Sequence, residues 1–297
     1  MLKPRRYFVL FFLLPLVVSC SKQKEEEPSK KSAPVVTTAP LPKKDTVVAK
    51  ALPENGLYKA YKLTGAQALV ELTEELGPKK MTILYKINRR DLKHLKQGET
   101  IAVPNSSDSE STYSPFPLRV YSLDSVSKVL MVSRRVQAFA AYEHGNLVEW
   151  GPTSTGKKAT PTPEGLYHTN WKSKETHSTV DDAWVLKWYF NLDNLEGISL
   201  HEYDLPGYPA SHSCVRLLAD DAQWIYNWAE QWKLSADRKT VATEGTPVIV
   251  FGDYAYGKTP PWKKLTSDSS ATSLSDKEVT GAVARFLPQK KVQLSSQ

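Results

Sequence analysis

The sequence contains little cysteine, and this scarcity excludes several classes of protein. Its 297 residues include two cysteines, Cys20 and Cys214, so a disulfide-rich scaffold is excluded. The N-terminal apolar run at residues 7–18 is too short to span a bilayer. The chain also lacks a cysteine pair and a His-Glu-x-x-His helix, although histidines and a glutamate lie near Cys214. We therefore expect neither a bound metal nor another cofactor.

The N-terminus has the features of a bacterial export signal. Three basic residues precede the apolar run, and residues 17–20 read Val-Val-Ser-Cys, which matches a lipobox. This pattern predicts a signal peptide over residues 1–19 and a lipid on Cys20. We expect a lipoprotein anchored in the cell envelope, in the outer membrane and facing the periplasm. The alternatives are an ordinary signal peptide and a weak membrane anchor.

The net charge argues against a nucleic-acid partner. Removing residues 1–19 removes three of the 39 Lys and Arg residues and none of the 32 Asp and Glu residues, so the formal net charge falls from +7 to +4. This balance does not favour binding to a polyanion. If Cys20 carries lipid, Cys214 has no disulfide partner in the chain. An unpaired thiol in an oxidising compartment indicates a chemical role.

Composition divides the rest of the chain into a tether, a small module, a linker, a main domain and a polar tail. The tether is rich in Lys, Glu, Pro, Thr and Ala, and about thirty residues of such coil reach roughly 30 Å. The five parts occupy residues 20–55, 56–104, 105–116, 117–252 and 253–297.

The small module has a β-α-α-β pattern. We expect a strand around Tyr58, a helix that ends at Gly77, a second helix that ends at Asn88, and a final strand near Ile101. This order, and the ending from Asn88 to Pro104, is similar to a LysM domain. The resemblance implies binding to the glycan strands of peptidoglycan. The alternative is a spacer that binds no ligand.

The main domain reads as a sheet protein, because short apolar runs alternate with turns rich in Gly and Pro. Residues 144–146 (His-Gly-Asn) predict a hairpin turn, and residues 248–251 predict a buried strand that closes the sheet. We interpret the aromatic residues of 168–200, including Trp171 and Trp184, mainly as core. His177 has no partner signal and is expected at the surface.

Two helices are expected towards the C-terminus. Asp220 and Asp221 suit the first turn of a helix whose apolar face includes Trp228 and Trp232. In the tail, Ser275 stands three residues before a glutamate, which predicts a capping box for a short amphipathic helix.

Cys214 is the candidate nucleophile, because a reactive thiolate needs a nearby base and two histidines lie close in sequence. The run Ser211-His212-Ser213-Cys214-Val215-Arg216, with His201 upstream, resembles the signature of the L,D-transpeptidases (YkuD family). That family has Gly at the position of Ser213. Residues 154–163, a Ser-Thr-Gly turn followed by Thr-Pro, resemble its second and weaker signature.

The resemblance implies that Cys214 is the nucleophile and His201 the proton acceptor and donor. It also implies that the second ring nitrogen of His201 is held by the backbone carbonyl of Glu202, although the Glu202 side chain is an alternative. His212 competes for the role of base, since an extended run would place it on the same side as Cys214. We assign His212 a supporting role.

The rest of the motif is assigned to binding of the substrate and its oxyanion: Ser211, His212, Ser213 and Arg216. Backbone N–H groups around Ser213 and Cys214 are the expected oxyanion donors. A serine in left-handed geometry at position 213 would cost on the order of 1–2 kcal/mol. Arg216 either holds a substrate carboxylate or carbonyl, or forms an ion pair with Asp220 or Asp221.

The resemblance further implies a mostly antiparallel β-sandwich with one main helix. It also implies that residues 168–200 cover the active site and contact the substrate, which is the alternative to their interpretation as core. The implied activity is transfer of peptidoglycan stem peptides through a cysteine acyl-enzyme, which forms 3→3 cross-links or exchanges the terminal D-Ala. The alternatives are an L,D-carboxypeptidase and a catalytically degenerate cell-wall lipoprotein. The expected partners are stem peptides, glycan strands and, through Cys20, a membrane.

Overall fold

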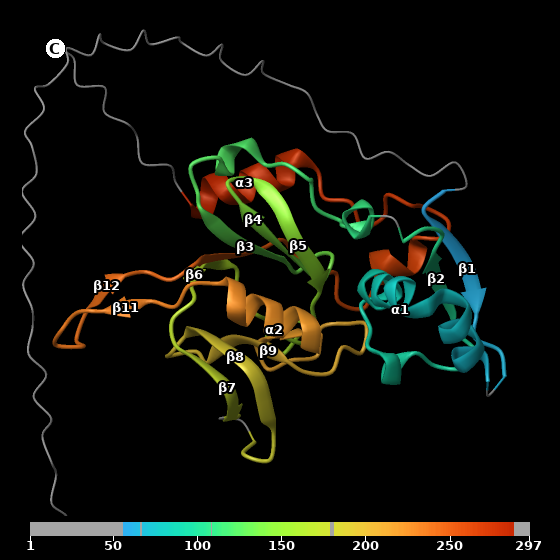
Figure 1. The fold of residues 1–297 in the computed structure, drawn as a ribbon, viewed down its shortest axis with the longest axis horizontal. Helices are drawn as coiled ribbons and strands as arrows, with labels where there is room; N and C mark the ends of the chain where they lie inside the picture. Colours follow the sequence, from blue (N-terminus) through green and yellow to red (C-terminus); the bar gives the residue numbers. More distant parts are fainter. Residues whose placement is uncertain (1–55, 66, 108, 179–180, 288–297) are drawn as a thin grey trace, which may run out of the picture. The chain divides into compact units, whose positions relative to one another are not determined.

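The structure, a computed structural model, describes residues 56–287 except residues 66, 108, 179 and 180 (Figure 1). The predicted signal peptide, Cys20 and the tether lie outside the described residues. The described chain is mostly β, as predicted, with strands β1 to β13 and helices α1 to α3. None of the helices in this part of the chain is long and apolar enough to cross a membrane.

Two sheets form a sandwich in the main domain. The larger sheet has the order β5-β4-β3-β13-β6 and the smaller the order β10-β9-β8-β7. Neighbouring strands are antiparallel, except that β3 pairs with β13, and β9 with β10, in parallel. The strands of the larger sheet are, in that order, Asn146–Pro152, Ala138–Glu143, Lys128–Ser133, Pro247–Phe251 and Gly165–His168. Those of the smaller sheet are Val215–Leu217, Ile198–Glu202, Val185–Asp193 and Lys172–His177.

The larger sheet is buried on both faces. Along β3, Val129 and Met131 pack with the C-terminal helix, whereas Leu130 and Val132 pack with the smaller sheet. Side chains of a strand alternate between the two faces, so burial of both faces produces the continuous apolar run seen in the sequence. Strand β13 carries another such run. It was expected to close the sheet, and it lies inside it between β3 and β6.

Helix α2 (Ala219–Trp228) covers the edge of the sandwich next to the smaller sheet. Ala222 and Ile225 lie in the core between the two sheets. The helix starts with Asp220 and Asp221 in its first turn, as expected. It ends at Trp228, so Trp232 lies beyond it and does not share its face.

Two of the hairpins in the main domain have different roles. The turn between β4 and β5 has positive φ at His144 (46°) and Gly145 (74°), which is the geometry that a tight hairpin requires. The second hairpin joins β11 (Lys233–Leu234) to β12 (Val241–Thr243), and it projects from the sandwich in Figure 1. Its strand residues are exposed, so it adds little to the core.

The N-terminal module has the predicted β-α-α-β order. Strand β1 (Tyr58–Lys62) pairs with β2 (Thr100–Pro104), and α1 (Ala68–Asn88) lies between this pair and the sandwich in Figure 1. Gly77 interrupts α1 with non-helical backbone angles (φ 67°, ψ 175°), so α1 is two helices joined at a kink. A short 3₁₀ helix, η1 (Leu92–His94), leads back to β2.

The expected linker at residues 105–116 is part of the packed structure. It contains the 3₁₀ helix η2 (Glu110–Tyr113) and is followed by η3 (Tyr121–Leu123). Tyr113 is buried against the module, and Phe116 is buried against the larger sheet. The polar composition of this stretch conceals two aromatic anchors, which is why the sequence suggested a linker.

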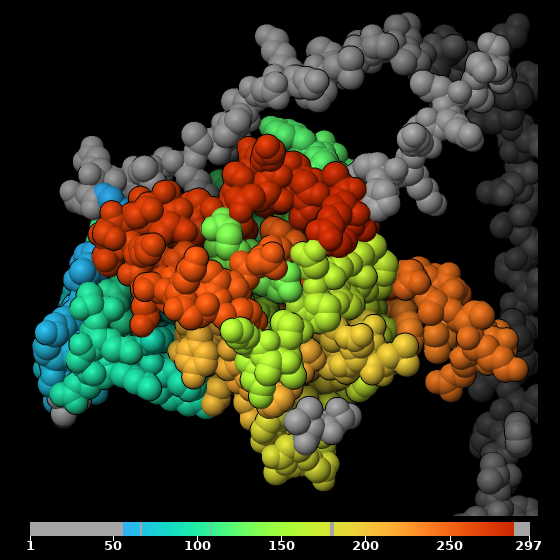
Figure 2. Space-filling model, turned by 180° about the vertical axis from the view of Figure 1, so that it is seen from behind, coloured from blue at the N-terminus to red at the C-terminus, as the bar shows by residue number. Residues whose placement is uncertain are grey.

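Residues 253–287 also differ from the polar tail that the sequence suggested. They contain η4 (Pro261–Lys264) and α3 (Asp276–Phe286), and α3 begins with the predicted capping box. Trp262 is buried between the module and β5, and Val283 is buried against the larger sheet. From behind, this segment (orange to red in Figure 2) covers the face between the module and the strands. Its buried apolar residues are few and widely spaced: Trp262, Leu265, Leu274, Val279, Ala282 and Val283.

Candidate functional site

The topology brings Cys214 next to the strand that carries His201. Strands β9 and β10 are parallel neighbours in which Arg216 lies opposite His201 and Val215 opposite Leu200. Cys214 directly precedes β10. Residues 203–214 form the connection between the two strands.

A cavity of about 170 Å³ lies at this junction. Cys214, His201, Ser211, His212 and Arg216 all line it. The opposite wall comes from β7, β8 and the segments that flank them, and it includes Trp171, Trp184 and Tyr189. Ser213 does not line the cavity and contributes backbone to the turn that carries Cys214.

His201 is buried and oriented by the backbone. Its Nδ1 lies 2.9 Å from the carbonyl oxygen of Glu202, so Nδ1 carries the proton and Nε2 is left as an acceptor. The ring stacks on Tyr189 (17° between planes, centroids 6.4 Å apart) and meets Tyr203 edge-on at 5.9 Å. Burial lowers the pKa of His201 to about 4. The hydrogen bond to the Glu202 carbonyl acts to raise this pKa, and the charge of Arg216 acts to lower it. The imidazole is therefore neutral at neutral pH.

The Cys214 thiol is held by the neighbouring strand. The Ser199 hydroxyl donates to Sγ at 3.2 Å, and the thiol donates to the carbonyl of Gly197 at 3.3 Å. Burial raises the pKa of Cys214, while hydrogen bonds from Ser199 and the charge of Arg216 act to lower it. Among the hydrogen bonds of the described residues, none joins Sγ to His201. The resting pair is thus a neutral thiol and a neutral imidazole, and proton transfer accompanies the reaction.

The turn before Cys214 is fixed at its carbonyl groups. Ser211 Oγ donates to the carbonyl of Cys214 at 2.5 Å, and Thr162 Oγ1 donates to the carbonyl of Ser213 at 2.7 Å. Ser213 has φ 99°, the conformation that the family's glycine adopts without strain. The N–H groups of Ser213 and Cys214 donate to no protein acceptor among the described residues, so they remain available to a substrate oxyanion.

His212 is in contact with a cation. Lys157 Nζ lies 2.7 Å from Nε2 of His212, so a protonated Lys157 donates to this nitrogen and leaves the imidazole proton on Nδ1. Desolvation lowers the pKa of His212, and the charges of Lys157 and Arg216 lower it further. With Nε2 occupied and Nδ1 protonated, His212 is less suited than His201 to accept a proton from Cys214.

Arg216 points to the cavity and does not pair with the first turn of α2. Its guanidinium lies 4.5 Å from the centroid of the Tyr203 ring. No ion pair within the described residues joins it to Asp220 or Asp221; Asp221 faces Lys86 of the module at 3.7 Å. Of the two expectations for Arg216, the geometry favours contact with a substrate.

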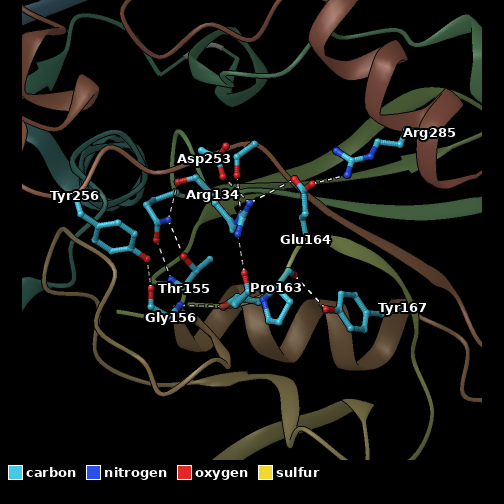
Figure 3. A network of polar contacts seen from close by, with 12 residues as sticks. Arg134, Thr155, Gly156, Pro163, Glu164, Tyr167, Asp253, Tyr256 and Arg285 are labelled. Atoms are coloured by element: carbon cyan, nitrogen blue, oxygen red, sulfur yellow. Dashed lines mark hydrogen bonds and ion pairs between the residues drawn. The ribbon is translucent and has the colours of Figure 1, made fainter. Parts of the chain in front are cut away.

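The segment that resembles the second signature belongs to a network of polar contacts (Figure 3). Arg134 is its centre: it contacts the carboxylates of Asp253 (2.8 Å) and Glu164 (3.4 Å) and the carbonyl of Thr162 (3.1 Å). Arg285 of α3 pairs with the same Glu164 at 2.7 Å. The C-terminal segment therefore contributes to the support of the site.

Gly156 connects this network to Ser213. Its carbonyl accepts the hydroxyl of Tyr256 (2.6 Å), and its N–H donates to Thr162 Oγ1 (2.9 Å), the atom that holds Ser213. A Cβ at this position would lie 2.1 Å from the carbonyl oxygen of Thr160, which requires glycine. The close approach of the Thr160 carbonyl thus explains why the Ser-Thr-Gly turn has glycine at position 156.

Several residues of the cavity were not among the candidate site residues predicted from the sequence. Ser199 contacts the nucleophile, Tyr203 contacts His201 and Arg216, and Trp171, Trp184 and His177 line the wall. Trp171 and Trp184 were interpreted as core, and His177 as a surface residue. The signal that was present is Ser199, which stands two residues before His201 and so shares its side of an extended strand.

The described residues contain no group of three or more His, Cys, Asp or Glu side chains arranged to hold a metal ion. His201 binds a backbone carbonyl, and His212 binds Lys157.

Comparison with known proteins agrees with the motif. Residues 127–250 match the model of the YkuD family, the L,D-transpeptidase catalytic domain. The predicted resemblance is thereby confirmed for this part of the chain. No curated protein matches the chain significantly.

Several solved structures of L,D-transpeptidases are similar to part of the chain. One from Stackebrandtia nassauensis is 24% identical, with 43% of this chain and 57% of that chain covered and a TM-score of 0.35. One from Mycobacterium smegmatis is 18% identical, with 42% and 59% covered and a TM-score of 0.34. L,D-transpeptidase 1 of Mycobacterium tuberculosis is 20% identical, with 42% and 62% covered and a TM-score of 0.32. The chain thus spans about three fifths of the length of these proteins.

Proposed function

We propose that this protein is an L,D-transpeptidase that acts on peptidoglycan stem peptides through an acyl-enzyme on Cys214. The observation that carries the proposal is the pairing, in one cavity, of the only thiol in the described chain with a neutral imidazole of fixed tautomer. The match of residues 127–250 to the catalytic domain of this family supports it.

In the first half-reaction, Cys214 transfers its proton to Nε2 of His201 as Sγ attacks the carbonyl carbon of the third stem residue. The N–H groups of Ser213 and Cys214 hold the oxyanion of the tetrahedral intermediate, and such donors are typically worth about 10²–10³ in rate each. The C–N bond to the terminal D-Ala then breaks, and His201 returns the proton to the leaving amine. A thioester remains on Cys214.

In the second half-reaction, the amine of a second stem attacks the thioester and gives a proton to His201. The new C–N bond is a 3→3 cross-link, and the thiol is regenerated. If a free D-amino acid attacks the thioester in place of the second stem, the terminal residue is exchanged. If water attacks it, the thioester is hydrolysed, which is L,D-carboxypeptidase activity. Arg216 is positioned to bind a carboxylate or carbonyl of the donor stem.

The proposal places the protein in the cell envelope. Residues 56–104 act as a LysM-like module that binds glycan, supported by their β-α-α-β order. Cys20, outside the described residues, carries the lipid that anchors the chain in the outer membrane. Two or three acyl chains on one lipoprotein anchor stably, whereas one chain alone does not.

The test uses the full chain and two reactions of the same thiol. Wild type should gain the mass of one imipenem molecule and convert disaccharide-tetrapeptides into 3→3 dimers. Cys214→Ala should do neither while keeping the thermal midpoint of wild type, and Ser122→Ala, far from the motif in sequence, serves as the matched control. Cross-linking by Cys214→Ala would refute the assignment.

One observation favours the degenerate, glycan-binding alternative: Ser213 adopts φ 99° where the family has glycine. If wild type stays unmodified by imipenem and Ser213→Gly is modified readily, the domain has lost its chemistry. Release of free D-Ala without dimers would instead indicate the carboxypeptidase.

A further inference from the structure

A large cleft lies between the N-terminal module and the main domain. Its volume is about 930 Å³, within the range of small-molecule sites, whereas the cavity at Cys214 holds about 170 Å³. One wall comes from α1 and the segment around η1, the other from the start of β8 and the end of β9. The lining includes Tyr85, Leu92, Lys93, Val185, Lys187 and Tyr203.

The cleft and the Cys214 cavity share one wall. Tyr203 lines both, and its ring contacts His201 (5.9 Å between centroids) and the guanidinium of Arg216 (4.5 Å) on the catalytic side. The Tyr203 side chain is therefore part of the wall between a ligand in the cleft and the catalytic cavity.

The two walls are fixed relative to each other. Asp91 of the module accepts the N–H of Leu205 at 2.8 Å, and its own N–H donates to the Leu205 carbonyl at 3.2 Å. Lys93 forms an ion pair with Asp204 across the same junction. The shape of the cleft is thus set before a ligand binds, which lowers the entropic cost of binding.

The lining of the cleft mixes apolar and charged groups. Leu92 and Val185 are 48% and 39% exposed, and they are among the few large apolar side chains left open to solvent in the described chain. Tyr85 and Tyr203 add aromatic rings, and the charged side chains of the lining comprise Lys86, Lys93, Lys187, Asp91, Glu202, Asp204, Asp220 and Asp221. A pyranose has a C–H face that packs on such apolar groups and hydroxyl and amide edges that bind polar ones. A helix-binding groove would be apolar throughout.

The size of the catalytic cavity also limits what it can hold. A disaccharide-tetrapeptide is many times larger than one amino-acid residue, so only the reacting end of the stem fits beside Cys214. The remainder of the substrate must lie on an adjoining surface. The cleft is large enough and directly adjoins the cavity through Tyr203.

We infer that the cleft between the module and the main domain binds the N-acetylated disaccharide of the strand whose stem reaches Cys214. The site is built by both parts of the chain and not by the module alone. This inference rests on the proposed function, and its test separates the two.

The experiment compares a disaccharide-tetrapeptide with the same tetrapeptide without sugar, each as donor to the full-length protein. Wild type should show a kcat/KM at least tenfold higher for the sugar-bearing donor. Val185→Asp and Leu92→Ser should reduce this preference to below threefold. Imipenem, which carries no sugar, should acylate both variants at the wild-type rate.

The chain offers a matched control for each variant. Val241 is 38% exposed and, like Val185, is the first residue of a strand; Leu234 is 37% exposed. Both lie in the projecting hairpin, so Val241→Asp and Leu234→Ser should keep the sugar preference. A wild type without sugar preference, or cleft variants that retain it, would overturn the inference while leaving the transpeptidase assignment intact. A wild type that neither reacts with imipenem nor converts either donor refutes the proposed function instead.

Discussion

Asp91 is expected to control the reactivity of Cys214 although it belongs to the N-terminal module. Its carboxylate Oδ2 accepts the N–H of Leu205 at 2.8 Å, and its Oδ1 accepts the N–H of His94 at 3.2 Å. Leu205 is completely buried and lies in the segment 203–213, which joins His201 to the nucleophile. Asp91→Ala leaves the N–H of Leu205 without its acceptor. We therefore expect this catalytic segment to shift.

The magnitude follows from the contacts. An unsatisfied buried N–H costs about 1–3 kcal/mol, and losing the cap on His94 adds on the order of 1 kcal/mol. If about 1.4 kcal/mol of this cost disfavours the position of the segment that is needed for reaction, the population of molecules in that position falls tenfold. Asp91→Asn keeps one amide oxygen for the same N–H, so it should lose much less.

The assay is the rate of acylation by imipenem as a function of imipenem concentration, which separates binding from chemistry. Asp91→Ala should lower the acylation rate constant about tenfold, and Asp91→Asn about threefold or less. Glu75→Ala is the control, because Glu75 is exposed and pairs with Lys59 inside the module. A lower thermal midpoint in Asp91→Ala with an unchanged acylation rate would refute the reasoning, since Asp91 would then only stabilise the fold.

Four further predictions concern single groups. The pKa of His201 is lowered to about 4, so the rate of imipenem acylation should change less than about twofold between pH 7 and pH 5.5. The rate should be lost only near pH 4. Loss near pH 6.5 would mean that His201 is not the base. Ser199→Ala removes the hydroxyl that donates to Sγ, so the midpoint of iodoacetamide alkylation should move to higher pH and acylation should slow by about tenfold; unchanged alkylation would remove Ser199 from the site. Ser213→Gly relieves the positive φ, so it should raise the free energy of unfolding by about 1–2 kcal/mol with acylation within about tenfold of wild type, as urea unfolding and mass measurements will show. Burial raises the pKa of Asp221 to about 7, so the folded state keeps a proton that the unfolded state releases above about pH 4. The free energy of unfolding should therefore fall as the pH rises from 4 to 7 and level off above pH 7. Asp221→Asn should flatten this slope.

The motif residues were accessible from sequence because they are local. Ser211 to Arg216 form one run, and the strand order that places His201 beside them needs a short connection. The sandwich was accessible for the same reason, since alternation of apolar residues reports which face of a strand is buried. Trp232 shows the limit, because a helical pattern continued past the point where the helix ends.

The rest of the site depends on contacts between distant segments. Asp91 binds Leu205, 114 residues away, and nothing in the local sequence of either residue indicates the other. Trp184, just before β8, lines the cavity together with residues of β9 and of the motif, and its own sequence neighbourhood does not indicate this. The tail at 253–287 looked polar on average, and the average conceals the spacing of its buried residues.

The end of α1 shows that the boundary between module and main domain is not a physical one. Lys86 is buried and contacts Glu149 at 2.9 Å and the carbonyl of Trp150 at 2.8 Å. Arg89 is also buried, donates to the carbonyl of Val136 at 2.8 Å, and lies 5.8 Å from the ring centroid of Trp150. Both cations are buried at this interface, and separating the two parts would break the hydrogen bonds and the ion pair that satisfy them. The module and the sandwich are therefore packed together, and if the module binds glycan as proposed, that glycan would be held at a fixed position relative to the thiol of Cys214.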